Sequence, residues 1–186
     1  VTFTNDSPVD SQSTEANDLM INAGMAAALF NEDIGGVAAD SELGRLVIEQ
    51  ADAGVIFGVT DTELGAGTTG PVNQIELRGD GTTANALDIG SLATIGGNGI
   101  VFNGGAGGLL TIETGNDAVR INGAVTLESD LRIDTDVAAA TDMEVGNVTF
   151  TNDSPVDSQS TEANDLMINA GMAAALFNED IGGVAA

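Results

Sequence analysis

Short stretches of three residues, apolar at their first and third positions, recur along this chain. Clusters of Gly, Asn, Asp, Ser and Thr separate them, and these residues favour turns. A period of two, carried by β-branched and aromatic residues, is typical of half-buried strands. The pattern predicts strands at VTF (Val1–Phe3), LMI (Leu19–Ile21), ALF (Ala28–Phe30), LVI (Leu46–Ile48), VIF (Val55–Phe57), IEL (Ile75–Leu77), LDI (Leu87–Ile89), IVF (Ile100–Phe102), LTI (Leu110–Ile112), VRI (Val119–Ile121), VTL (Val125–Leu127), LRI (Leu131–Ile133) and MEV (Met143–Val145).

The segment from Thr14 to Phe30 allows a second interpretation. Its Ala and Met content could support an amphipathic helix that begins near Ser13. However, Asn22 and Gly24 interrupt the middle of the segment. Its two triplets, LMI and ALF, also precede the later triplets LVI and VIF by the same number of residues, as expected for strands that stack on one another. We therefore expect strands rather than a helix in this segment.

A long exact repeat organises the chain. Residues 1–39 recur letter for letter as residues 148–186, which defines a repeat unit of 147 residues. We interpret residues 1–147 as one tandem unit of a continuous solenoid and residues 148–186 as the start of the next identical unit. We expect the chain to be a window on a longer polypeptide.

The spacing of the triplets predicts how they stack. Phe3, Phe30 and Phe57 follow one another at a constant interval, and the same interval separates Ile21 from Ile48. Such spacing is typical of a parallel β-solenoid, in which each coil buries its apolar face against its neighbours. We count about six coils of about 24.5 residues per unit, with a rise of roughly 29 Å. The three Phe side chains should form one inner column, with Phe150 restarting the pattern.

Composition and charge narrow the possible partners. The chain has 29 acidic residues, four Arg and no Lys, for a net charge of −25. Nucleic acid is excluded as a partner, because phosphate contacts need clustered Lys and Arg. The longest apolar run, Met25–Phe30, is far too short to cross a bilayer, so membrane insertion is not expected.

The side chains that usually carry catalysis are scarce. His, Cys, Lys and Tyr are absent, which removes the common general bases, thiol nucleophiles and Schiff-base amines. Asp134 and Asp136 lie close to Arg132 in sequence, but nothing completes the residue set that pectin-hydrolysing β-helices use. We therefore expect a protein that is not an enzyme.

Acidic residues near strand ends form the candidate metal sites. Stacked coils would bring such side chains within roughly 5 Å of each other, the spacing of neighbouring strands. The plain interpretation is a solvated acidic face, and the functional one is oxygen coordination of Ca²⁺ or Mg²⁺. The candidate ligands, with Ca²⁺ as the candidate cofactor, are Asp6, Asp33, Asp61, Asp130, Asp134 and Asp136.

Two long segments suggest a family. NALDIGSLATIGGNGIVFNGG and LLTIETGNDAVRINGAVTLESDLRIDTD resemble the giant secreted repeat proteins of aquatic and environmental bacteria, which are broadly similar to filamentous-haemagglutinin-like adhesins. The resemblance lies in composition and strand rhythm and covers the whole chain. It implies a right-handed β-helical shaft displayed outside the cell, and it assigns no functional residue.

These observations together predict an all-β protein, a right-handed parallel β-helix (β-solenoid). The expected function is mechanical, as a scaffold, spacer or matrix component of an extracellular or cell-surface bacterial fibre. Its expected partners are neighbouring repeat units and divalent cations. The alternative is an adhesin shaft whose loops bind glycan or a host surface, with residues 11–18 and their copy at 158–165 as the loop to test. The absence of Tyr and Trp favours the structural interpretation, because glycan sites usually stack sugars on exposed aromatic rings.

Overall fold

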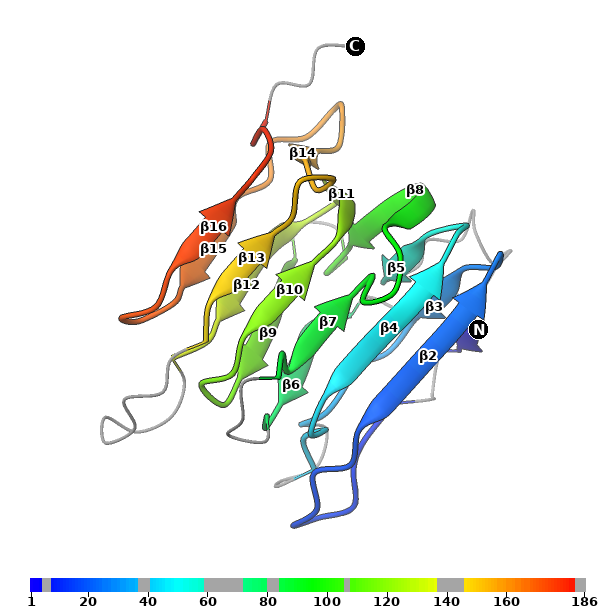
Figure 1. Cartoon of the computed structure of the whole chain (residues 1–186), viewed down its shortest axis with the longest axis vertical. Coiled ribbons are helices and arrows are strands. Elements are labelled where there is room, and N and C mark those ends of the chain that lie inside the picture. Colours follow the sequence, from blue (N-terminus) through cyan, green and yellow to red (C-terminus); the bar gives the residue numbers. More distant parts are fainter. Residues whose placement is uncertain are drawn as a thin grey trace.

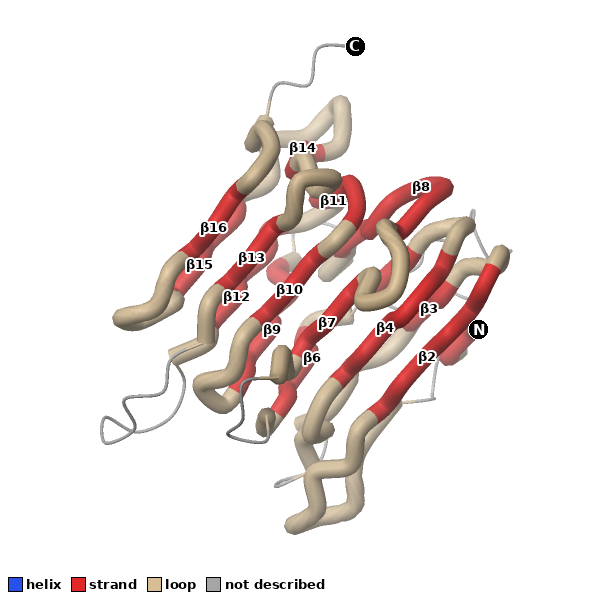
Figure 2. The backbone as a smooth tube through the Cα atoms, viewed as in Figure 1, coloured by secondary structure: helices blue, strands red, loops and turns tan. Residues whose placement is uncertain are grey.

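The fold is all-β, as the sequence predicts. The computed structural model describes residues 1–4, 8–36, 41–58, 72–79, 84–105, 108–136 and 146–182. These residues form short strands in three separate parallel sheets and contain no helix (Figure 2). In Figure 1 the sequence colours run in order across the molecule, so strands that follow one another in the chain lie progressively further along it.

We call the three sheets A, B and C. Sheet A contains β1 (Thr2–Phe3), β3 (Ala28–Phe30), β5 (Val55–Phe57), β8 (Ile95–Phe102), β11 (Gly123–Leu127) and β14 (Val156–Ser158). Sheet B contains β6 (Gln74–Leu77), β9 (Leu109–Thr114), β12 (Asp130–Asp134) and β15 (Leu166–Asn169). Sheet C contains β2 (Leu19–Gly24), β4 (Leu46–Ala51), β7 (Leu87–Ile89), β10 (Val119–Ile121), β13 (Val148–Phe150) and β16 (Ala175–Phe177).

The chain visits the sheets in a fixed order. From β5 to β16 it passes through sheets A, B and C in turn and then returns to sheet A, one strand further along. Before β5, sheet B is represented by single residues, because Val9 bridges Ile34 and Ile34 bridges Ile75 of β6. We call one passage through the three sheets a circuit. Each circuit therefore stacks on the previous one by parallel backbone hydrogen bonds.

Columns of identical side chains fill the interior. Phe3, Phe30, Phe57 and Phe102 stack in sheet A with ring centroids 5.0, 5.0 and 5.3 Å apart. This confirms the predicted Phe column and extends it by one member. Isoleucines form equivalent columns in the other sheets. They pair in register as Ile75, Ile112, Ile133 and Ile168 in sheet B and as Ile21, Ile48, Ile89 and Ile121 in sheet C.

The ambiguous segment near the start of the chain forms strands. Leu19–Gly24 is β2 and pairs with β4, so that Ile21 faces Ile48. Ala28–Phe30 is β3 and pairs with β5. Burial against the next circuit outweighs the intrinsic helix preference of Ala and Met, as tertiary packing commonly does. The predicted triplet Met143–Val145 lies outside the described residues.

The predicted count of six coils per unit is wrong. Strand pairing places Phe3, Phe30, Phe57, Phe102 and Leu127 on successive circuits of sheet A. The next unit begins at β13, two strands after β11. One repeat unit therefore makes four circuits and two thirds of a fifth, with a rise of about 22 Å rather than about 29 Å. Circuits differ in length, because the connections between their strands differ. A short circuit runs from Ile112 to Ile133 and a much longer one from Phe57 to Phe102.

The fractional circuit places identical sequences on different sheets. The VTF strand lies in sheet A as β1 and in sheet C as β13. Phe150 consequently stacks on Phe177 at 4.8 Å in sheet C, where it continues the column of Ile121, and does not restart the Phe column of sheet A.

Candidate functional site

A row of acidic side chains runs across the outer face of sheet B. On β6, β9 and β12 the alternate residues Ile75, Ile112 and Ile133 point into the core. Because side chains alternate between the two faces of a strand, their neighbours point outward. The register places Glu76 opposite Glu113, and Glu113 opposite Asp134. We call these three residues the acidic row.

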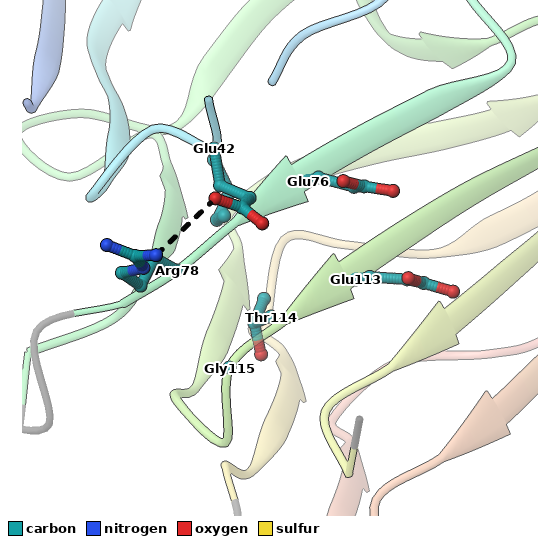
Figure 3. A pocket seen from close by; sticks show the side chains of 7 residues that line it. Glu42, Glu76, Arg78, Glu113, Thr114 and Gly115 are labelled. Carbon is teal, nitrogen blue, oxygen red and sulfur yellow. Dashed lines mark ion pairs between the residues drawn. The ribbon is translucent and has the colours of Figure 1, made fainter. Parts of the chain in front are cut away.

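An open pocket of about 190 Å³ lies at one end of the acidic row. It is lined by Glu42, Glu76, Leu77, Arg78, Glu113, Thr114 and Gly115 (Figure 3). Arg78 Nη2 approaches Glu42 Oε2 at 3.9 Å, and this Glu42 oxygen is buried without a hydrogen bond among the described residues. The pocket therefore holds one loosely paired carboxylate beside two carboxylates of the row.

Glu76 is the member of the row whose titration is perturbed. Burial is the main reason that the pKa of the Glu76 carboxyl is raised above its ordinary value. Repulsion from four neighbouring carboxylates raises it further; they are Glu113, Glu42, Asp33 and Asp10. The Glu76 carboxylate also lies against Gly36, where an added Cβ atom would overlap Glu76 Oε2. The negative charge of Glu76 is thus held close to others of the same sign.

Arg132 neutralises the other end of the row. Its guanidinium forms an ion pair with Asp134 and approaches Glu113 Oε1 at 3.9 Å. The second Asp134 oxygen accepts hydrogen bonds from the Asp136 backbone N–H and from Asn169 Nδ2, both at 3.0 Å. Asp134 is only 4% exposed. Its carboxylate is therefore fully engaged by protein donors and links β12 to β15.

The other predicted ligands occupy structural positions. Asp33 Oδ1 accepts hydrogen bonds from the backbone N–H groups of Asn73 at 2.7 Å and Gln74 at 3.2 Å, at the start of β6. Asp130 Oδ1 accepts one from the Asp165 N–H at 2.8 Å, just before β15. Both carboxylates thus tie one circuit to the next.

The structure brings only some of the predicted ligands together. Asp134 and Asp136 are neighbours, whereas Asp130 lies at the opposite end of the five-residue strand β12, about 13 Å from Asp134 along the strand. Asp33 belongs to a different connection, between β3 and β4. Asp6 and Asp61 lie outside the described residues. Within the described ranges, no group of three or more acidic side chains is arranged to hold a metal ion.

The acidic row itself was not identified from the sequence. Glu76 and Glu113 do stand at outward positions of their strands, which was the available signal. The interval from Glu76 to Glu113 is much longer than the one from Glu113 to Asp134, however, so no constant period connects the three. The carboxylates of the row give this face of sheet B a negative charge that attracts cations.

The polar loop at residues 11–18 is a second candidate site. Ser11 Oγ accepts hydrogen bonds from the backbone N–H and the Nδ2 of Asn17, both at 3.0 Å. In the second copy, Ser158 Oγ accepts the same two bonds from Asn164, at 3.0 and 3.2 Å. The loop therefore closes in the same way in two different surroundings, which shows that its shape is set by its own residues.

Comparisons with protein-family models, curated proteins and solved structures found no match to this chain. In the part of the chain that the structure describes, no helix is long and apolar enough to cross a membrane.

Proposed function

We propose that this chain is a structural segment of an extracellular or cell-surface bacterial fibre, built as a right-handed β-solenoid. Its role is mechanical, as a scaffold, spacer or matrix component. One observation carries the proposal: the second copy of the repeat continues the same three sheets without a break. β13, β14 and β15 pair with β10, β11 and β12. A unit that stacks directly on its predecessor can extend into a rod by adding copies.

The connections support the proposed handedness. Parallel strands joined by a crossover are right-handed in nearly all known sheets, because twisted strands return to the sheet most easily that way. The strands of all three sheets are parallel, so every return to a sheet is such a crossover. This supports a right-handed path.

Rod length tests the proposal directly. Chains with two, three and four copies of the repeat unit should form rods that lengthen by about 22 Å per copy, measured by electron microscopy or small-angle scattering. A chain with the same copies in which buried Ile48 and Phe57 are replaced by Asp serves as the control. Copies that appear as separate globules joined by flexible links would overturn the fibre proposal.

The alternative function is an adhesin shaft that binds glycan or a host surface. The observation in its favour is the self-closed polar loop at 11–18 and 158–165, most of whose residues are exposed. Binding of the chain to a glycan array, lost when Ser11 and Ser158 are both replaced by Ala, would support this function. An array without any signal above that of the double variant favours the purely structural role.

Divalent cations are proposed as partners of the fibre. Residues 1–147 hold 23 acidic residues and four Arg, a net charge of −19. Spread over about 22 Å, this is one net charge per about 1.2 Å, denser than the roughly 1.7 Å of duplex DNA. Such a rod gathers counterions, and Ca²⁺ is the candidate because its preferred ligands are carboxylate oxygens.

A further inference from the structure

The two copies of the repeated segment, residues 1–39 and 148–186, occupy different positions in the same fold. The LMI strand lies in sheet C as β2 and in sheet B as β15, and the ALF strand lies in sheet A as β3 and in sheet C as β16. Each strand of the second copy thus lies one sheet back in the order A, B, C. The cause is the two-thirds circuit left over in every repeat unit.

The two copies also differ in what covers them. In the first copy, Ile34 is 0% exposed because it bridges Ile75, whereas the equivalent Ile181 is 54% exposed. Ala28 is likewise fully buried beneath β5, whereas the equivalent Ala175 is exposed. The same residues are therefore buried or open according to whether a following circuit covers them. We call the surface formed by β15, β16 and Ile181 the end face.

The first copy identifies what fits the end face. In the first copy the equivalent surface is covered by β4, β5 and Ile75 of β6. The paired residues are Leu19 with Leu46, Phe30 with Phe57 and Ile34 with Ile75. The end face has the same sequence as the surface that these residues cover. The apolar side chains and unpaired backbone groups of the end face therefore match those of β4, β5 and Ile75.

We propose that the end face binds β4 and β5 of an added copy of residues 40–147, which continues the second repeat unit, in the register of the first unit, so that successive units turn by one sheet. Leu166 would face Leu46 of that copy, and Phe177 would face its Phe57. The column of Phe150 and Phe177 would then be the start of the second unit's own Phe column, which lies one sheet back from that of the first unit. This inference rests on the proposed fibre function and adds its symmetry.

The symmetry determines where each loop is displayed. The loop at 11–18 follows Val9, which belongs with sheet B, and leads into sheet C, whereas the loop at 158–165 connects sheets A and B. A third copy would place the loop between sheets C and A, and a fourth would repeat the first. A fibre of such units presents every surface feature on all three edges, which suits a partner that binds several loops at once.

Disulfide formation tests the register, since the chain has no native Cys. The protein is the full chain lengthened after Ala186 by a second copy of residues 40–186. Neighbouring parallel strands lie about 4.8 Å apart, within the Cα separation that a disulfide spans. Met167→Cys with Val47→Cys in the added copy should oxidise as completely as the control pair Met20→Cys with Val47→Cys in the first copy, where these positions already face each other.

Two further variants make the test specific. Met167→Cys with Ile56→Cys in the added copy should keep both thiols free, because Ile56 is expected opposite Leu176. Ile181→Asp should prevent the disulfide across the new junction and leave the first-copy control disulfide intact. Thiol titration gives both results.

Rod length measured on the same lengthened chain separates the possible failures. A longer rod in which the Met167 pair stays reduced, or in which the Ile56 pair oxidises instead, overturns the register and leaves the fibre function standing. Two separate globules overturn both. A disulfide found only in dimers would place the second copy in another molecule, which also overturns the proposal.

Discussion

The stacked Phe column gives the sharpest contrast between single residues. Phe57 is fully buried between Phe30 and Phe102, whereas Phe3 is partly exposed and, among the described residues, stacks on Phe30 alone. Removing a buried aromatic ring deletes its contacts and leaves a cavity. We expect Phe57→Ala to lower the free energy of unfolding by about 3–5 kcal/mol in urea titrations. Phe3→Ala should cost clearly less, and equal losses would contradict the column as described.

The raised pKa of Glu76 predicts a pH effect of defined sign. The folded state holds the Glu76 proton more tightly than the unfolded state does, whose pKa is near 4.5. The free energy of unfolding therefore falls as pH rises from that value through the raised pKa. The destabilisation is complete once the pH exceeds the raised pKa. Because the Glu76 side chain is only partly buried and its charge is screened by solvent, its replacement by Gln should stabilise the fold at pH 7 by no more than about 1 kcal/mol.

Thermal melts at pH 7 and pH 4.5 check this expectation. Glu76→Gln should raise the melting temperature at pH 7 and reduce the difference between the two pH values. Glu15→Gln is the matched control, because it removes the same charge from an exposed loop position. If both variants gain the same stability, general charge repulsion accounts for the effect and the acidic row does not.

The sequence predicted the residues of the core better than those of the surface. The interval that joins Phe3, Phe30 and Phe57 is constant, so the column could be predicted from it. The outward-facing residues Glu76 and Glu113 become neighbours only in the folded structure. The connections between their strands are of unequal length, so no constant interval in the sequence relates the two residues. A solvent-facing side chain also carries no hydrophobic signal that would fix its partner.

At the scale of strands, the sequence predicts which segments form strands but not how many strands make up one circuit. The alternating pattern predicts thirteen triplets, and each of those within the described residues overlaps a strand. Sheet B begins, however, with the single bridging residues Val9 and Ile34, which show no alternating pattern in the sequence. The early circuits therefore show fewer triplets in the sequence than there are sheets, which is why the triplet pattern predicts too many circuits.

The contact between β5 and β8 depends on a glycine. Gly58 directly follows β5 and has a φ of 78°, and a Cβ atom there would collide with the Asn103 carbonyl oxygen on the next circuit. Gly24 ends β2 with a φ of 57° but has open space around it. Gly24→Ala should cost about 1 kcal/mol for the backbone conformation alone.

Gly58→Ala should cost more than Gly24→Ala, by about 2 kcal/mol or more, because the two circuits must also move apart. Urea unfolding of the two variants measures the difference. Equal costs would mean that the Asn103 backbone yields without loss and that the spacing of the circuits does not depend on Gly58.

At the scale of the whole molecule, charge density predicts a response to cations. Carboxylates stacked about 5 Å apart repel each other, and exposed charges are screened by any salt. We expect Ca²⁺ to raise the melting temperature or promote bundling more than Na⁺ at equal ionic strength, and EDTA to reverse the effect. Melting curves and light scattering measure the two responses.

A matched series of variants would locate the effect. Asp130→Asn and Asp33→Asn remove predicted ligands that also accept backbone hydrogen bonds, whereas Glu15→Gln removes a charge elsewhere. A Ca²⁺ effect reduced only by the first two variants would indicate bound ions. If Na⁺ reproduces the whole effect, the specific sites should be abandoned.

The direction of the hydrogen bonds between circuits determines how the molecule responds to force. The strands lie across the stack, so their ladder bonds point along it, and a load applied at the two ends pulls on one circuit at a time. A circuit such as the one from Phe30 to Phe57 would release about 90 Å of extended chain while giving up about 4.8 Å of stack. Tension is thus relieved in a series of small openings rather than by one rupture. Because each circuit retains its neighbours as a template, we expect it to refold when the load falls, and we expect the chain to behave under load as an extensible tether that dissipates work.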